Sequence, residues 1–504
     1  MFRKVLIANR GEIACRIARA LRDAGIRSVA VYSEADRDGL HVRLSDEAYP
    51  IGPAASSASY LRMDAVLEAA EKSGAEAIHP GYGFLAENPR FAQACQDDGV
   101  VFIGPPPSAM ALMGDKARAR EVAVKAGVPV VPGSRPLDSL EAAEAEAERI
   151  GYPLLVKATA GGGGKGMRRV VRREEIRSAF EQARSEAQAS FGDPSVYLEK
   201  YVEHPRHIEI QVLGDGRGSV VHLFERECSI QRRHQKLIEE APSPFLDGEL
   251  RARMGEAAVS LARASGYQNA GTVEFLVNAD RSFYFLEMNA RLQVEHPVTE
   301  LVTGVDLVLL QLAVASGDPL PFSQDELSPR GWAMEFRITA EDPFQNFMPT
   351  AGTLSVYRPP EGPGIRHDAG IFQGQRVTPH YDPLIAKLIV SGENRHQCIS
   401  RARRAIREYR VQGVCTTLPF FERMLSDERF VSGEMDVGFV DRHWMEEIAL
   451  RPGARESELF PAALAAAAAA VEEQDALANS SAELGAPASP WKLAGTRELM
   501  RGRT

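Results

Sequence analysis

A run of glycines follows a lysine that ends an apolar stretch. Residues 157–167 read Lys-Ala-Thr-Ala-Gly-Gly-Gly-Gly-Lys-Gly-Met. Consecutive glycines let backbone N–H groups surround phosphate oxygens, and Lys157 stands where it can meet phosphate charge. The segment is not the GxxxxGK[ST] loop, because no Ser or Thr follows its lysine. A flexible surface linker is the alternative, but a linker seldom follows a buried strand with a lysine at each end. We therefore expect a phosphate-binding loop.

Two acidic side chains and an amide lie on neighbouring apolar stretches. Residues 282–289 alternate as a strand does, so Glu287 and Asn289 project from one face. Glu274 lies in the preceding stretch, and the turn residues at 278–282 predict a hairpin that brings the three side chains together. Two carboxylates and an amide oxygen suit Mg²⁺ bound with nucleotide phosphates. A solvated strand face is the alternative, which the nearby phosphate loop disfavours.

Three polar residues spaced by two follow this strand directly. Arg291, Gln293 and Glu295 share one face if residues 289–297 are extended. A guanidinium, an amide and a carboxylate that point together can hold a small planar anion and take a proton from it. A surface ion pair is the alternative.

Residues 228–236, Cys-Ser-Ile-Gln-Arg-Arg-His-Gln-Lys, form a basic segment in an acidic protein. The segment is either a contact for phosphate or bicarbonate or a solvated loop, and its charge alone favours the solvated loop. Cys228 indicates a packed thiol rather than a nucleophile, since no base is assured beside it.

Residues 332–339 alternate between apolar and polar side chains. Glu335, Arg337 and Thr339 share one face of the predicted strand, and the apolar side chains share the other. We therefore expect Arg337 to point away from the core side of its strand, and the pattern by itself favours an ordinary solvent-facing arginine.

Strands and helices alternate around these residues. Residues 4–8, 12–24 and 28–32 predict a strand, a helix and a strand, which indicates a doubly wound N-terminal region. No GxGxxG follows the first strand, so no dinucleotide site is predicted. A strand at 75–78 leads into the turn-rich loop 79–84, which we expect to face a ligand. Further helices are predicted over 116–126, 172–190, 249–265 and 395–410, with a strand over 151–158.

Composition limits the class of protein. The 504 residues suggest about three or four domains, and 44% hydrophobic with 25% charged residues is typical of globular protein. A net charge of −10 argues against nucleic acid as a main partner. No stretch approaches the roughly 18 apolar residues of a membrane span. The five cysteines are scattered without a CxxC pair, which favours a reducing compartment, so we expect a cytoplasmic protein without a membrane partner.

Several of these segments, in order, resemble the biotin carboxylase family of ATP-grasp enzymes. The matching segments are residues 7–14, 79–85, 113–116, 161–167, 206–211, 231–236, 287–297 and 337–342. The resemblance covers about residues 1–446 and implies an α/β and α+β fold. It implies a doubly wound pre-ATP-grasp domain (1–115), an ATP-grasp domain (116–330) with a mobile lid at about 131–203, and a β-rich C-terminal domain (331–447). An alanine-rich tail (448–504) follows, in which a helix is predicted over 461–478 but no core of its own.

The resemblance also implies roles for individual residues. Glu274, Glu287 and Asn289 would hold Mg²⁺ or Mn²⁺. Glu295 would deprotonate bicarbonate, and Arg337, assisted by Arg291, would stabilise the biotin enolate. The residues implied to bind bicarbonate are Lys236, Arg291, Gln293 and the Val294 amide. Those implied to contact ATP are Lys116, Lys157, Gly163, Gly164, Glu199, Lys200, Val202, His207, Gln231 and His234.

The implied reaction uses MgATP and bicarbonate to carboxylate N1′ of biotin through carboxyphosphate. No methionine in the chain is followed by lysine, so the Ala-Met-Lys-Met biotinylation motif is absent and biotin is expected on a separate carrier protein. The resemblance further implies a homodimer whose partners include carboxyltransferase subunits. The final acceptor, whether acetyl-CoA, propionyl-CoA, another acyl-CoA or pyruvate, stays open.

Two competing hypotheses remain at this point. A carboxylate–amine ligase or carbamoyl-phosphate-forming enzyme of the same fold would not need Arg337 or the segment from Arg291 to Glu295. A catalytically silent ATP-binding scaffold would have lost a metal ligand or the base, and all of these residues are present.

Overall fold

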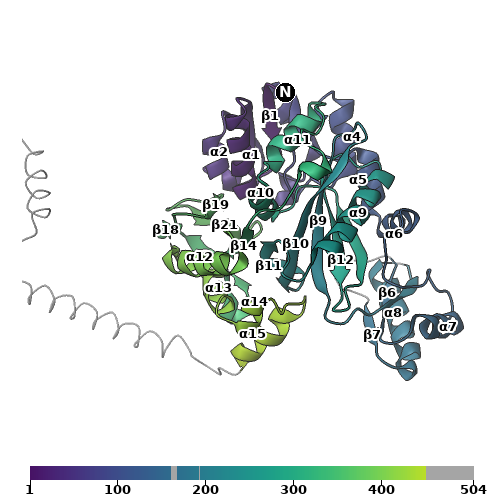
Figure 1. The fold of residues 1–504 in the computed structure, drawn as a ribbon. Helices are drawn as coiled ribbons and strands as arrows, with labels where there is room; N and C mark the ends of the chain where they lie inside the picture. The colour runs from purple at the N-terminus through teal and green to yellow at the C-terminus, as the bar shows by residue number, and fades with distance from the viewer. Residues whose placement is uncertain (160–166, 192, 450–504) are drawn as a thin grey trace, which may run out of the picture. The chain divides into compact units, whose positions relative to one another are not determined.

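The computed structural model describes residues 1–159, 167–191 and 193–449 of the chain (Figure 1). The chain divides into two compact units, Met1–Arg442 and His443–Thr504. The first unit holds every described residue of the predicted site. Gly163, Gly164 and the helix predicted over 461–478 lie outside the described residues.

The N-terminal region is a parallel sheet with the strand order β3-β2-β1-β4-β5. The predicted strand, helix and strand are all present, and the order reverses at β1, as in doubly wound folds. Helix α1 buries Ile13, Ile17 and Leu21 because apolar residues recur along one of its faces. The elements are β1 (Lys4–Ile7), α1 (Gly11–Asp23), β2 (Arg27–Ser33), η1 (Glu34–Asp36), α2 (Leu40–Leu44), β3 (Glu47–Gly52), η2 (Ser56–Ala58), α3 (Met63–Ser73), β4 (Ala77–His79), α4 (Pro89–Asp97), β5 (Val101–Phe102) and α5 (Pro107–Gly114).

The segment predicted as a lid builds a small antiparallel sheet of its own, with the order β7-β6-β8. Helices α7 and α8 pack on this sheet around a separate apolar cluster that includes Val156, Phe180 and Leu198. The predicted strand begins at Leu154 rather than at residue 151. The elements are α6 (Lys116–Lys125), α7 (Leu140–Ile150), β6 (Leu154–Ala158), β7 (Arg168–Val170), η3 (Arg173–Glu175), α8 (Ile176–Phe191) and β8 (Val196–Lys200).

One antiparallel sheet carries most of the predicted site. Its order is β13-β12-β9-β10-β11-β14-β21-β19, so it continues without a break across the domain boundary predicted at residue 331. Helix α9 packs on β9 and β10, and α12 packs on β14 and β21 (Figure 1). The elements are β9 (Arg206–Gly214), β10 (Val220–Arg232), β11 (Gln235–Ala241), α9 (Gly248–Ala264), β12 (Asn269–Val277), β13 (Phe283–Asn289), α10 (His296–Thr303), α11 (Leu307–Ala315), η4 (Gln324–Glu326), β14 (Trp332–Thr339), β19 (Ile365–Ala369), β21 (Leu384–Gly392) and α12 (Arg395–Glu408).

Short strands and helices complete the C-terminal region. Three two-stranded pairs, β15-β16, β17-β20 and β18-β22, form separate small sheets in this region. The elements are β15 (Glu341–Asp342), η5 (Pro343–Gln345), β16 (Met348–Pro349), β17 (Gly352–Thr353), β18 (Val356–Arg358), β20 (Arg376–Val377), β22 (Arg410–Gln412), α13 (Leu418–Met424), α14 (Glu428–Ser432) and α15 (Phe439–Ala449).

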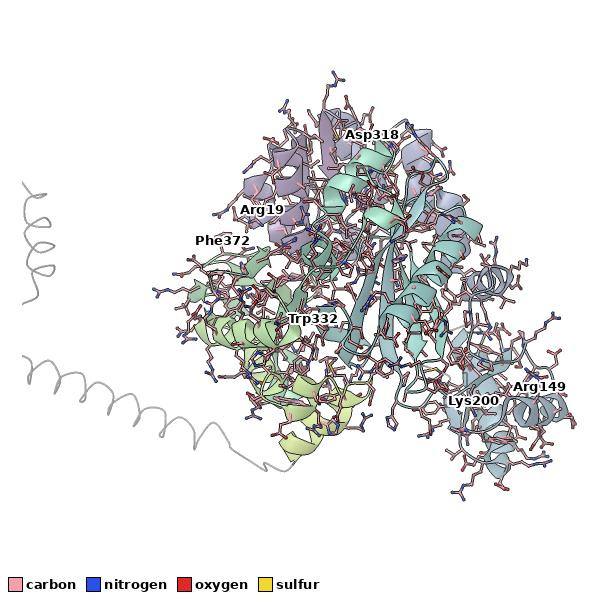
Figure 2. All side chains as sticks on the ribbon, in the orientation of Figure 1. Arg19, Arg149, Lys200, Asp318, Trp332 and Phe372 are labelled. Carbon is pink, nitrogen blue, oxygen red and sulfur yellow. The ribbon has the colours of Figure 1, made fainter. Side chains whose placement is uncertain are left out.

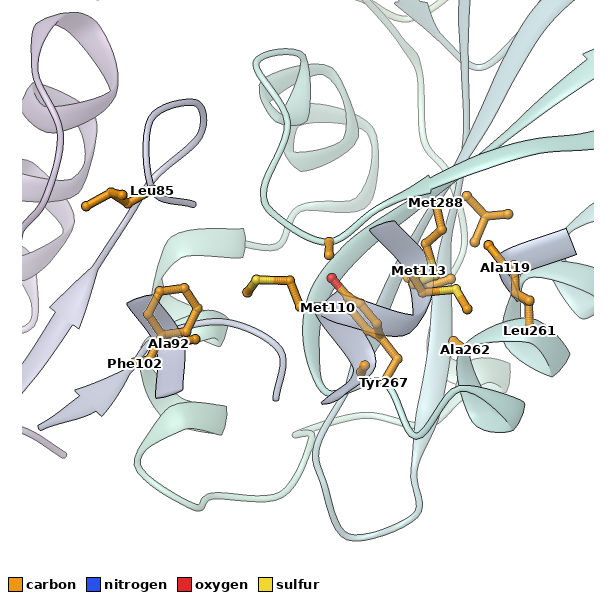
Figure 3. Packing of buried hydrophobic residues seen from close by; sticks show 14 of the residues in the cluster. Leu85, Ala92, Phe102, Met110, Met113, Ala119, Leu261, Ala262, Tyr267 and Met288 are labelled. Atoms are coloured by element: carbon orange, nitrogen blue, oxygen red, sulfur yellow. The ribbon is translucent and has the colours of Figure 1, made fainter. Parts of the chain in front are cut away.

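A shared apolar core joins the N-terminal sheet to the large sheet. Figure 3 shows Met110 and Met113 of α5 lying between Phe102 of β5 and residues of α9 and β13. Burying these side chains contributes about 25 cal/mol per Å² of apolar surface removed from water. The core therefore fixes the loops after β1 and β4 relative to the strands that carry the site.

Among the residues that the structure describes, no single helix is long and apolar enough to cross a membrane. Helices α10 and α11 meet the length and composition criteria only as a pair, and the chain bends by 95° between them.

Candidate active site

A cavity of about 570 Å³ opens where the N-terminal sheet faces the large sheet. The loops after β1 and β4 form one wall, as expected for a doubly wound sheet whose order reverses between these two strands. Lys236, Arg291, Val294 and Arg337 form the opposite wall. Four residues named separately in the sequence thus share one cavity, and Tyr82 of the turn-rich loop lies across from them.

The basic segment is the hairpin between β10 and β11, with Gln231 opposite Lys236. Arg233 and His234 form its exposed turn with φ values of +48° and +66°. The solvated interpretation therefore holds for these two residues and for the exposed Gln235 that follows them. Lys236 turns inward, where its Nζ lies 2.5 Å from Glu209, 2.6 Å from Glu295 and 3.1 Å from Glu274.

Glu295 is held between two cations. It is 2% exposed, and its carboxylate accepts from Lys236 at 2.6 Å and from Arg337 at 2.9 Å. Burial alone would raise the pKa of Glu295, but the charges of Lys236, Arg337 and Arg226 outweigh burial and hold this pKa well below its ordinary value. In the same way, burial lowers the pKa of Lys236, but three carboxylates around it raise that pKa well above the ordinary value. Both groups are therefore ionised at neutral pH.

The predicted hairpin of β12 and β13 places Glu274 directly opposite Glu287. The Asn289 amide donates to Glu274 at 3.0 Å. Each of the three side chains also faces a cation: Glu274 lies 3.1 Å from Lys236, Glu287 lies 3.4 Å from Lys116, and the Asn289 oxygen accepts from Arg291 at 2.9 Å. A cluster of hard oxygen donors that already attracts positive charge fits a divalent cation such as Mg²⁺.

The segment after β13 is not extended throughout, so the prediction of one shared face for Arg291, Gln293 and Glu295 is wrong in part. Glu295 caps α10 with φ −80° and ψ 9°. Gln293 still reaches the common cluster and donates to Glu274 at 2.8 Å. Arg291 turns aside and pairs with Glu87 at 2.9 Å.

The prediction that the polar face of β14 is exposed to solvent is also wrong. Glu335 is 0% exposed, and Thr339 is buried as well, because α12 covers one face of the strand and the site covers the other. Arg337 pairs with Glu239 at 2.5 Å and with Glu295 at 2.9 Å, so it is a half-buried, ion-paired member of the site. Trp332, where β14 begins (Figure 2), donates its indole N–H to Glu240 at 2.6 Å.

The lid residues pair with one another in this structure. Lys157 donates to Glu199 across the β6–β8 pair. Lys200 (Figure 2) donates to the Tyr152 carbonyl at 2.8 Å, and Val202 is half-buried just after β8. Lys116, at the start of α6, is exposed.

Two predicted nucleotide contacts join the oxygen cluster. The His207 ring lies 2.9 Å from Glu274, and the Gln231 amide lies 3.2 Å from the other ring nitrogen of His207. Cys228 is a packed thiol as predicted, since it is fully buried and burial holds its pKa well above the ordinary value.

Three buried charges that the motifs did not indicate lie beneath the site: Glu209, Arg226 and Glu239. Arg226 is 0% exposed and donates to Glu209, Gln211, Thr272, Thr299 and Gln293. Burial raises the pKa of Glu239 to about 7 despite Arg337. Alternation of polar and apolar residues along β9 could have found Glu209, but Arg226 of β10 and Glu239 of β11 lie in runs of charged residues without such alternation.

Three family models match the chain: "Biotin carboxylase, N-terminal domain" over residues 1–110, "Carbamoyl-phosphate synthase L chain, ATP binding domain" over 115–323, and "Biotin carboxylase C-terminal domain" over 335–442. Biotin carboxylase 1 of Bacillus subtilis is 52% identical over 445 residues, which are 88% of this chain and 99% of that protein. The biotin carboxylase of Halalkalibacterium halodurans is 52% identical over 444 residues, which are 88% of this chain and 98% of that protein.

A solved structure extends the comparison to ligands. The biotin carboxylase domain dimer of 2-oxoglutarate carboxylase from Hydrogenobacter thermophilus, in complex with MgADP, ADP and bicarbonate, superposes with a TM-score of 0.81 at 48% identity. The match covers 88% of this chain and 98% of that chain.

The fold and the cavity, lined by both basic and acidic side chains, define an ATP-grasp ligase. The chain belongs to the biotin carboxylase family. Its activity is the ATP- and bicarbonate-dependent carboxylation of biotin, the first half-reaction of biotin-dependent carboxylases. The predicted fold class and activity are confirmed, while the domain boundaries and the residue roles stay predictions.

Proposed function

We propose that Glu295 is the base that takes the proton from bicarbonate in this reaction. The observation that carries the proposal is its place between Lys236 and Arg337 at the wall of the cavity. With both cations on its carboxylate, Glu295 is a weak base. A bound bicarbonate would share the charge of these cations, so the pKa of Glu295 would rise toward the range that proton transfer requires.

Bicarbonate would lie against Lys236, Arg291, Gln293 and the Val294 amide. Arg291 offers a planar fork of N–H donors at the cavity, and Gln293 is anchored by Arg226 at 3.2 Å and by Glu274 at 2.8 Å. Anchored donors hold the anion in one orientation, which converts its encounter with the phosphate into an effectively unimolecular step.

ATP would lie with its phosphates between the lid and the oxygen cluster. Glu274, Glu287 and Asn289 would hold Mg²⁺, which neutralises charge on the phosphate oxygens when bound. Lys116 and Lys157 would release their present carboxylate partners and contact the phosphates. The remaining contacts, made by the lid, by the start of β9 and by the β10–β11 hairpin, would be Gly163, Gly164, Glu199, Lys200, Val202, His207, Gln231 and His234.

The proposed reaction proceeds in three steps. A deprotonated bicarbonate oxygen attacks the γ-phosphorus, the bond to ADP breaks, and carboxyphosphate forms. Carboxyphosphate separates into CO₂ and phosphate, and the phosphate takes the N1′ proton of biotin. The enolate attacks CO₂, and Arg337, with Arg291 nearby, stabilises its negative charge.

The proposal extends to partners. Biotin would be presented by a separate biotin carboxyl carrier protein, and carboxyltransferase subunits would use the product. The chain would act as a homodimer in the cytoplasm, as supported by the dimer named for the Hydrogenobacter relative and by the match to a Bacillus biotin carboxylase.

ADP release tests the proposal directly. The wild type is assayed with MgATP, with and without bicarbonate and free biotin, beside Glu295→Gln. Glu300→Gln is the matched control, because Glu300 is also buried and ion-paired, at 3.0 Å from Arg16, but does not line the cavity.

We expect ADP release that requires bicarbonate, rises with biotin and falls by about 100-fold or more in Glu295→Gln but not in Glu300→Gln. Release that is indifferent to bicarbonate and biotin would support a different ligase. ATP binding without turnover would support the silent scaffold.

A further inference from the structure

A fully buried lysine lies directly behind the cavity. Lys387 of β21 is 0% exposed and stands opposite Arg337 in the sheet, so the two side chains share a face. Lys387 itself does not line the cavity. No motif of the sequence drew attention to it, and the proposed mechanism leaves it unused.

The Lys387 ammonium joins three separate parts of the cavity wall. It donates to the Val294 carbonyl at 2.7 Å and lies 3.2 Å from Glu12 of α1. It also lies 5.9 Å from the centre of the Tyr82 ring, whose hydroxyl donates to Glu12. Val294, Glu12 and Tyr82 all line the cavity. One buried cation therefore lies against both walls of the cavity: Val294 on one wall, and Glu12 and Tyr82 on the other.

Strong surrounding charges keep this lysine ionised. Burial lowers the pKa of Lys387, but Glu12, Glu335 and Asp368 raise it above the ordinary value, against an opposing effect of Arg366. Its acidic partner Glu12 is easier to protonate than an ordinary carboxylate, because burial raises the pKa of Glu12 to about 7. An ammonium in such a site stays only where it has hydrogen-bond acceptors, and Val294 and Glu12 provide them.

The contact with Val294 matters because its loop lacks regular structure. Residues 290–295 connect β13 to α10 outside any strand or helix, yet they carry Arg291, Gln293 and Glu295. A loop that has no ladder of backbone hydrogen bonds depends on individual contacts for its position. Lys387 provides such a contact at Val294, between Gln293 and Glu295.

We propose that Lys387 is a positioning residue that fixes the 290–295 loop for bicarbonate binding. The inference rests on the proposed function, since it assumes that this loop binds bicarbonate. Without the ammonium, the Val294 carbonyl loses its partner, and the Gln293 amide and the Glu295 carboxylate on either side of it move out of position. A misplacement of about 1 Å is enough to cost on the order of 100-fold in rate.

Lys387→Met tests the proposal by steady-state kinetics of ADP release, with bicarbonate and ATP varied separately. We expect the KM for bicarbonate to rise about 10-fold or more and the KM for ATP to change less than about twofold. Arg395→Met is the matched control. It removes a half-buried cation from the buried Glu240, 2.8 Å away, at a place that does not line the cavity.

The double variant Lys387→Met/Glu12→Gln separates positioning from stability. It removes the unpaired buried carboxylate that the single variant leaves, so it should recover melting temperature while the KM for bicarbonate stays high. Recovery of both quantities, or an equal rise in both KM values, would overturn the proposal. If only the double variant folds, a raised KM for bicarbonate with an unchanged KM for ATP supports the proposal, and any other pair of KM values overturns it. Wild-type turnover without bicarbonate would instead refute the proposed function, which keeps the two failures distinct.

Discussion

Replacing Arg226 by methionine tests the view that buried charge beneath the cavity supports both stability and bicarbonate binding. Arg226 is fully buried, and the change removes its hydrogen bonds to Glu209, Gln293 and three neighbours. Breaking a buried ion pair on one side costs about 3–5 kcal/mol. Glu209 keeps Lys236 at 2.5 Å, which places the expected cost near the lower limit, at about 3 kcal/mol.

The size of the protein sets the measurable shift. Unfolding entropy is about 2.1 cal/mol/K per residue, so over 504 residues each kcal/mol moves the melting temperature by about 1 °C. We expect Arg226→Met to melt about 3 °C below the wild type in a thermal scan. Gln293 loses a donor to its amide oxygen, so the KM for bicarbonate should also rise by about three- to tenfold in the ADP-release assay.

Arg251→Met is the control for this experiment. Arg251 pairs with buried Glu225 at 2.8 Å, but its side chain is 21% exposed and does not line the cavity. This variant also removes a cation from a fully buried carboxylate, so it should lower the melting temperature by about 3 °C or more, but it should leave the KM for bicarbonate unchanged. A shift below about 1 °C for Arg226→Met, or a rise in KM for both variants, would refute the reasoning.

Three further predictions address the metal, the base and the core. Glu287→Gln should raise the Mg²⁺ concentration for half-maximal ADP release by about tenfold, which a Mg²⁺ titration measures, because one hard anionic donor is lost. Lys236→Gln removes the first cation that lowers the pKa of Glu295. A carboxylate base works only when deprotonated, so the acidic limb of kcat/KM against pH should move upward by about one unit or more. Phe336→Ala should cost about 3–5 kcal/mol, seen as a melting temperature about 3–5 °C lower, because the ring is 0% exposed.

Features encoded within a few residues could be predicted from the sequence. The β12–β13 hairpin is such a feature: alternation on each side of a turn-rich segment was enough to pair Glu274 with Glu287, and the structure pairs these two residues. The first strand, helix and strand were predictable for the same reason, since one apolar face and one glycine at the end of α1 define them locally.

Features that depend on what covers a strand could not be predicted. Glu335 and Arg337 alternate with apolar residues, which is the pattern of a strand with one solvated face. In the folded chain that polar face lies under the 290–295 loop and beside β21, so Glu335 is fully buried and the half-buried Arg337 pairs with Glu295. Lys387 and Arg226 escaped notice for this reason. Alternation predicts which side chains share a face of a strand, but it does not predict which other elements pack on that face.

The eight-stranded sheet has a consequence for anyone who divides or recombines this chain. Strands β11 and β14 pair from Ala241 with Ala333 to Ile238 with Phe336, so the ATP-grasp and C-terminal regions meet as neighbouring strands. A fragment that ends near residue 330 would expose the long edge of β11 with its unpaired N–H and C=O groups, a surface that invites aggregation. A chimaera between relatives should therefore exchange β11 and β14 together, as one cassette, and place its junctions in the loops beyond them.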